Sequence, residues 1–97
     1  MPNIKPESPL TMEEILLLCG YKVHYKDEEN CSLVPKDKNS KLRPINIPQN
    51  PGPIGISVQI IEHMLFEARI DSFQYHSLLT QVQENQKAQQ NAQIRNL

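Results

Sequence analysis

The sequence predicts an α+β domain, a two-layer sandwich of order α-β-β-β-α with a short C-terminal helix added. Three observations predict this class. An apolar run with helical spacing ends at residue 20, a two-residue alternation follows it, and helical spacing returns after residue 57. We therefore expect a three-stranded antiparallel sheet that carries its helices on one face.

The N-terminal part is predicted to be an arm followed by a helix. Residues 1–9 hold three prolines and no periodicity, so we expect a flexible arm. The helix is predicted over 12–19, because Thr11 and Glu14 have the spacing of a capping box. Gly20 stands where a left-handed residue ends many helices.

Three strands are predicted next. The first covers 21–26, where apolar residues alternate with basic ones. This alternation places Tyr21, Val23 and Tyr25 on one face and Lys22, His24 and Lys26 on the other. An acidic turn at 27–30 leads to a second strand around 31–36 and a third within 42–48. Pro44 has no N–H to donate, which favours an edge position or a bulge for the third strand.

Two helices and a tail complete the chain. Ser57 caps a helix whose apolar residues repeat at helical spacing: Ile61, Met64, Leu65 and Ala68. Asp71 and Gln74 form a second capping box, which begins the short last helix. From Glu84 onward the chain is rich in Gln and Asn, so we expect a domain over 10–82 and a polar, disordered tail over 83–97.

Composition sets limits on function. The chain has 97 residues, 38% of them hydrophobic, and no Trp, which fits one small domain with an aliphatic core. Its formal net charge of −1 gives no overall attraction to nucleic acid or an anionic membrane. No apolar run approaches the ~18–20 residues that cross a bilayer. We expect a soluble, cytoplasmic protein without a cofactor.

The potential metal ligands are scattered. Cys19, Cys31, His24, His63 and His76 do not have the close spacing of a zinc site. Cys19 lies in an apolar helical run and is predicted to be a small core residue, although a disulfide with Cys31 stays open. The acidic turn is predicted to be solvated charge, and no metal site is predicted.

Several short motifs together resemble one family. They are Gly20-Tyr21 after the first helix, Ile47-Pro48-Gln49-Asn50, Gly55, and the helical stretch SVQIIEHMLFEARIDSFQYHSLL. Their order over about residues 11–80 resembles the HicA messenger-RNA interferases of bacterial toxin–antitoxin pairs. That resemblance implies a fold of the double-stranded-RNA-binding-domain type.

The sequence departs from that family at its catalytic turn. Counted without gaps from Gly20, the family's Gly-Ser-His turn falls on Glu28-Glu29-Asn30, so Asn30 stands at the position of the catalytic histidine. Asn50 stands at the family's later histidine. An amide does not titrate near neutral pH and cannot transfer the proton. The resemblance therefore implies a relative that is not an active nuclease of the usual kind.

Three functions stay open. The first is a non-catalytic interaction module that binds RNA or an antitoxin-like protein partner. The second is a divergent interferase that uses His24 as its acid–base group, and the third is a small adaptor with only architectural similarity. The RNA-binding candidates are Lys22, His24, Lys26, Lys36, Lys38, Lys41 and Arg43. The partner-binding candidates are the apolar residues of the last helix, Phe73, Tyr75, Leu78 and Leu79.

Overall fold

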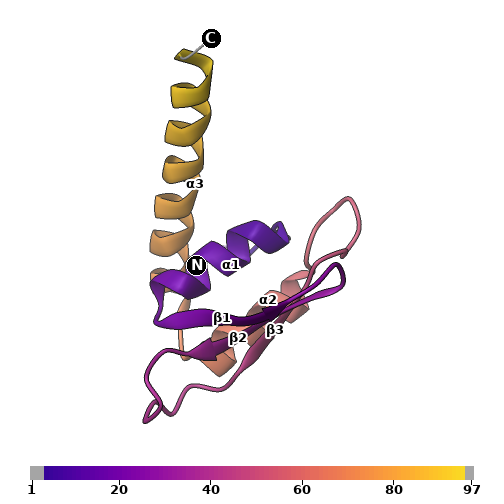
Figure 1. Cartoon of the computed structure of the whole chain (residues 1–97), viewed down its shortest axis with the longest axis vertical. Helices are drawn as coiled ribbons and strands as arrows, with labels where there is room; N and C mark the ends of the chain where they lie inside the picture. Colours follow the sequence, from indigo (N-terminus) through magenta and orange to yellow (C-terminus); the bar gives the residue numbers. More distant parts are fainter. Residues whose placement is uncertain (1–3, 96–97) are drawn as a thin grey trace.

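Three antiparallel strands and three helices form the predicted α+β fold (Figure 1). The structure is a computed structural model and describes residues 4–95. The elements follow the predicted order, with α3 directly after α2. They are α1 (Pro9–Leu18), β1 (Tyr21–Lys26), β2 (Asn30–Pro35), β3 (Ile45–Pro48), α2 (Val58–Ala68) and α3 (Ser72–Arg95).

The sheet has the order β1-β2-β3 and buries one of its faces. The register pairs Cys31 with Ile47 and Leu33 with Ile45, and all four side chains are buried. The neighbouring pair, Ser32 with Asn46, points to the opposite face, where side chains are exposed or half-buried. Both α1 and α2 contribute to the same core cluster as the buried strand residues. The edge position that Pro44 predicted for the third strand is confirmed.

The predicted alternation of β1 is wrong after Val23. Val23 pairs with Leu33, but the next pair is Tyr25 with Ser32, so one extra residue, His24, bulges between them. A bulge reverses the faces of the residues that follow it. Tyr25 therefore lies on the open face and is 59% exposed, while Lys26 shares the helix-covered face with its partner Cys31.

The N-terminal segment is not the free arm that the sequence predicted. Ser8, and not Thr11, caps α1, because its Oγ accepts from the Thr11 N–H at 3.2 Å. Glu7 and Ile56 form an antiparallel bridge with N···O distances of 2.7 and 3.3 Å. The described part of the arm is thus hydrogen-bonded to the loop before α2, and residues 1–3 lie outside the described residues.

The boundaries of α2 and the start of α3 agree with the sequence. Ser57 caps α2, and Asp71 and Gln74 form the predicted capping box, with N···O distances of 2.8 and 3.2 Å. The prediction of a short last helix followed by a disordered tail was wrong. Helix α3 continues to Arg95 and projects beyond the sheet and α1 (Figure 1). No Gly or Pro interrupts it, and Gln, Glu, Lys and Ala are good helix formers. Residues 96–97 of the predicted tail lie outside the described residues.

Candidate functional site

The hairpin tip between β1 and β2 is held by one carboxylate. Asp27 Oδ1 accepts from the backbone N–H of Glu29 at 2.8 Å and from that of Asn30 at 2.7 Å. These two hydrogen bonds, the one from Asn30 first, hold the pKa of the Asp27 carboxyl below its usual value. The acidic turn is therefore a structured turn whose first acid has a local structural role.

The two asparagines that the sequence resemblance placed at histidine positions, Asn30 and Asn50, lie at this same tip. Asn46 on β3 donates its Nδ2–H to Asn30 Oδ1 at 3.0 Å. Asn50, just after β3, donates its Nδ2–H to the carbonyl oxygen of Glu28 at 2.7 Å. Both amide side chains thus connect the hairpin tip to the third strand and the loop behind it. The sequence comparison singled out Asn30 and Asn50, and the structure shows that both lie at the hairpin tip.

The tip is expected to loosen only in acid. Because the native pKa of Asp27 lies below its ordinary value of 3.8, its stabilising effect is present above that pH and is lost as the pH falls through the native pKa. The amide chemical shifts of Glu29 and Asn30 should move together between about pH 5 and pH 2. In Asp27→Asn, which keeps the acceptor oxygen but cannot titrate, the movement of those shifts should be clearly smaller. Equal movement in the variant would contradict this assignment.

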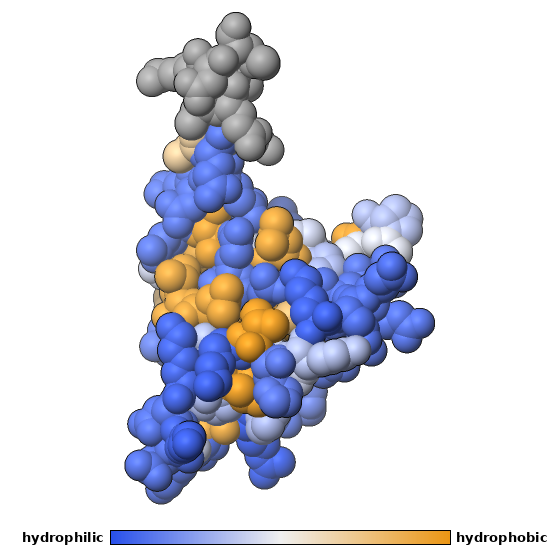
Figure 2. All heavy atoms as spheres, viewed as in Figure 1, coloured by the Kyte–Doolittle hydropathy of each residue, from blue (hydrophilic) through white to orange (hydrophobic). Residues whose placement is uncertain are grey.

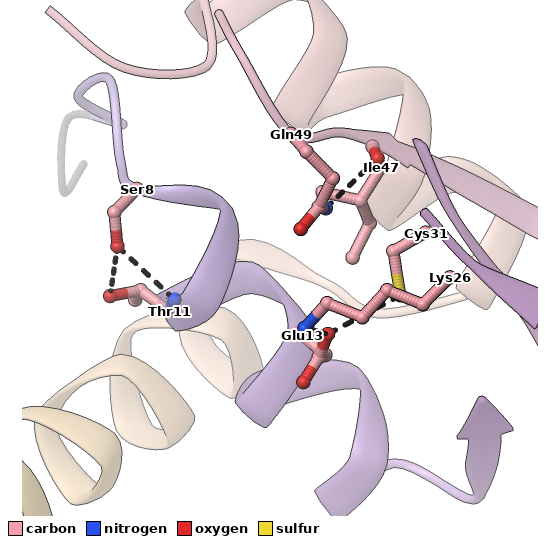
Figure 3. Close-up of polar contacts among 7 residues, drawn as sticks. All are labelled: Ser8, Thr11, Glu13, Lys26, Cys31, Ile47 and Gln49. Atoms are coloured by element: carbon pink, nitrogen blue, oxygen red, sulfur yellow. Dashed lines mark hydrogen bonds and ion pairs between the residues drawn. The ribbon is translucent and has the colours of Figure 1, made fainter. Parts of the chain in front are cut away.

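The predicted basic row on β1 does not form. Lys26 Nζ donates to Glu13 Oε1 on α1 at 2.8 Å, and Cys31 Sγ donates to the same oxygen at 3.3 Å (Figure 3). The hydrogen bond and charge of Glu13 raise the pKa of Lys26, and burial raises the pKa of Cys31 to about 11. Lys26 therefore forms a partly exposed ion pair with α1, on the other face from Lys22.

The remaining RNA-binding candidates are dispersed. His24 is exposed in the bulge and has no hydrogen-bond partner among the described side chains. Lys36 and Lys38 are exposed at the polar turn after β2. Lys41 and Arg43, by contrast, line a groove against the end of α2 together with Arg69. Arg69 was missed by the sequence reading.

The partner-binding candidates separate into core and surface. Tyr75 is fully buried in the core, so its prediction as a binding residue is wrong. Leu79 is half-buried against the core cluster. Leu78 is likewise half-buried against the core cluster, although it lines a groove with Phe73 and with Leu18 at the end of α1. Phe73 is exposed and remains available to a partner.

The two grooves meet at the turn between α2 and α3. Arg69 and Ile70 line both of them, so the groove beside Lys41 and the groove beside Phe73 adjoin at these two residues. We call this surface the α2–α3 corner. Phe66 belongs to it and was also missed, although an apolar residue off the buried stripe of α2 was a visible signal. The corner comprises Leu18, Lys41, Arg43, Phe66, Glu67, Arg69, Ile70, Asp71, Phe73 and Leu78.

The corner is rich in exposed aromatic surface. Phe66 is 78% exposed and Phe73 is 74% exposed, the largest fractions for aromatic side chains among the described residues. On the side of the molecule seen in Figure 2, apolar side chains also gather along α1 and the lower part of α3, whereas the projecting part of α3 is hydrophilic. An aromatic ring left in water forgoes the free energy of its burial.

No metal-binding arrangement comes together within the part of the chain that the structure describes. Cys31 is buried, Cys19 is half-buried, and both are free thiols, so the disulfide left open by the sequence is absent. His63 Nε2 lies 3.4 Å from Glu67 Oε1, one turn further along α2.

Comparison with known proteins identifies no relative of this chain. No protein-family model, no curated protein and no solved structure matches the chain. Over residues 4–95, no helix combines the length and the apolar character that crossing a bilayer demands.

Proposed function

We propose that this domain is a non-catalytic interaction module with a HicA-like pattern, and that it binds a protein partner through the α2–α3 corner. One observation carries the proposal: Phe66 and Phe73 are both largely exposed at grooves that share Arg69 and Ile70. Burying one such ring is worth about 1.5–3 kcal/mol. Exposed apolar surface beside a polar rim is typical of binding sites. In a HicA-like setting, the partner would be an antitoxin-like protein.

The hairpin tip supports the absence of catalysis. Asn30 and Asn50 use their amides for hydrogen bonds within the fold, and an amide supplies no titratable proton near neutral pH. His24, the alternative acid–base group, is exposed in the bulge, and no side chain of the described residues forms a hydrogen bond that would orient it. Efficient proton transfer needs a group positioned against its substrate.

A protein is favoured over RNA because of the charge distribution. Lys26 is paired with Glu13 on the helix-covered face of the sheet, and Lys22 lies on the opposite face. Affinity for an RNA backbone rises with each phosphate contact, and the chain's net charge is −1.

The proposal predicts no RNA cleavage by the purified chain. Wild type and His24→Ala should both leave a labelled RNA intact at the level of a buffer control, because neither carries a positioned acid–base group. A denaturing gel over a time course makes the measurement, with a bona fide ribonuclease as positive control. Cleavage by wild type that is lost in His24→Ala would instead establish the divergent interferase.

A further inference from the structure

We infer that the segment that binds the α2–α3 corner is acidic, and that it presents at least two carboxylates beside bulky apolar side chains. This inference rests on the proposed function and names the chemistry of its partner. It is carried by the balance of charges at the corner and by the backbone conformation of Arg69.

The grooves are lined by three cations, Lys41, Arg43 and Arg69, and by two acids, Glu67 and Asp71, which leaves a net positive charge. Both acids already have partners within the fold. Glu67 lies 3.6 Å from Arg43 Nε and 3.4 Å from His63, and Asp71 caps α3 by accepting from the Gln74 N–H at 2.8 Å. Neither Lys41 nor Arg69, by contrast, forms an ion pair with any side chain that the structure describes.

The free cations stand beside the apolar surface. Lys41 lines the groove that contains Phe66, and Arg69 lines this groove as well as the one that contains Phe73 and Leu78. A partner that buries the rings therefore brings its own side chains against both cations. A basic partner would be repelled there, and a neutral one would desolvate the cations without compensation.

Arg69 occupies a conformation that suits glycine better. It is the C-cap of α2 with φ 57° and ψ 41°, and its N–H bonds to the carbonyl oxygens of Leu65 and Phe66. Arg69 is the one described non-glycine residue with positive φ. Glycine adopts this conformation without a Cβ clash and is the usual residue here. The long cationic side chain is thus present at a site where the backbone does not favour it, which fits a role in binding.

Peptide selection tests the inference without a known partner. A random peptide library is displayed and selected on the immobilised full chain, and the affinities of enriched peptides are measured against variants. We expect enrichment of Asp and Glu beside Leu and aromatic residues. The double charge reversal Lys41→Glu with Arg69→Glu should lower the affinity for these peptides at least about tenfold. The matched control is Lys22→Glu with Lys87→Glu, which makes the same charge change away from the corner and should leave affinity unchanged.

The outcomes separate the inference from the proposed function. If peptides bind the corner reversal variant as tightly as wild type but lose affinity for Phe66→Ala with Phe73→Ala, the corner binds proteins and the acidic character is wrong. If no peptide is enriched, or if the enriched peptides bind Phe66→Ala with Phe73→Ala as tightly as they bind wild type, the proposed function itself fails. Binding of an RNA duplex that requires Lys41 and Arg69 would overturn both.

Arg69→Gly provides a second, independent readout. Because glycine relieves the left-handed strain while loss of the cation weakens its interaction with the α2 dipole, the thermal midpoint should be unchanged or rise by up to about 5 °C. The affinity for selected acidic peptides should nevertheless fall about tenfold. A lowered midpoint with unchanged affinity would show that Arg69 serves the helix alone and would overturn its part in the inference.

Discussion

Tyr75→Ala is expected to lower the free energy of unfolding by about 3–5 kcal/mol, as for other large aromatic truncations in protein cores. A domain of this size has a total stability of only about 5–15 kcal/mol. The variant should therefore be largely unfolded at moderate temperature, which thermal and urea unfolding followed by circular dichroism would measure.

The size of this effect follows from the position of Tyr75. Its side chain is fully buried, and its hydroxyl donates to Met12 Sδ on α1 at 3.9 Å. Burial raises the pKa of the Tyr75 hydroxyl to about 12, as expected for a phenol surrounded by apolar groups. Removal of the ring leaves a cavity between α1 and α3, and the fixed elements around it can close only part of the space.

Phe73→Ala is the matched control for Tyr75→Ala. Phe73 lies two residues earlier on α3 and is mostly exposed, so its truncation should change the free energy of unfolding by no more than about 0.5 kcal/mol. The same variant should weaken partner binding. If Phe73→Ala destabilises the domain as much as Tyr75→Ala, Phe73 is a core residue and the corner is not a free surface.

Local capping signals in the sequence placed the starts of α2 and α3 correctly. Ser57, followed by apolar residues at helical spacing, correctly predicted the start of α2, and Asp71 with Gln74 correctly predicted the start of α3. Both could be predicted because a helix cap involves residues only three positions apart. The N-cap of α1 was misplaced because Ser8 and Thr11 both satisfy the cap preference. The structure shows the two hydroxyls bonded to each other at 2.9 Å.

Features that depend on pairing between distant segments were not predictable in the same way. The bulge at His24 changes which face Tyr25 and Lys26 occupy, and nothing in the local alternation marks an extra residue. The bridge between Glu7 and Ile56 likewise joins segments far apart in the sequence.

The candidate site was partly visible in the sequence. The amides at 30 and 50 were identified by position, yet their shared location at the hairpin tip required the fold. The core role of Tyr75 could have been found, since Tyr75, Leu78, Leu79 and Val82 repeat at i, i+3, i+4 and i+7 while Phe73 does not. The left-handed backbone of Arg69 has no comparable signal, because glycine is the residue that marks it.

Gly55→Ala is the second substitution with a large expected effect. Gly55 has φ +102°, and a Cβ at this position would lie 2.7 Å from the carbonyl oxygen of Glu7. That oxygen accepts the Ile56 N–H at 2.7 Å, so the contact cannot relax without breaking the bridge. Strain at positive φ costs about 1–2 kcal/mol, and each lost hydrogen bond costs about 0.5–1.5 kcal/mol. With both hydrogen bonds of the bridge lost, we expect a total loss of about 2–5 kcal/mol.

Gly52→Ala separates the two causes of this loss. Gly52 has nearly the same backbone angle, φ +101°, but nothing lies within 4 Å of a Cβ placed there. The free energy of unfolding of Gly52→Ala should therefore fall only by the cost of backbone strain, about 1–2 kcal/mol. Native-state hydrogen exchange gives the structural readout: the amide of Ile56 should exchange much faster in Gly55→Ala and remain protected in Gly52→Ala, because only the first substitution pushes Glu7 away. Equal destabilisation and equal protection in both variants would mean that the N-terminal segment adds no stability through its bridge to the loop before α2.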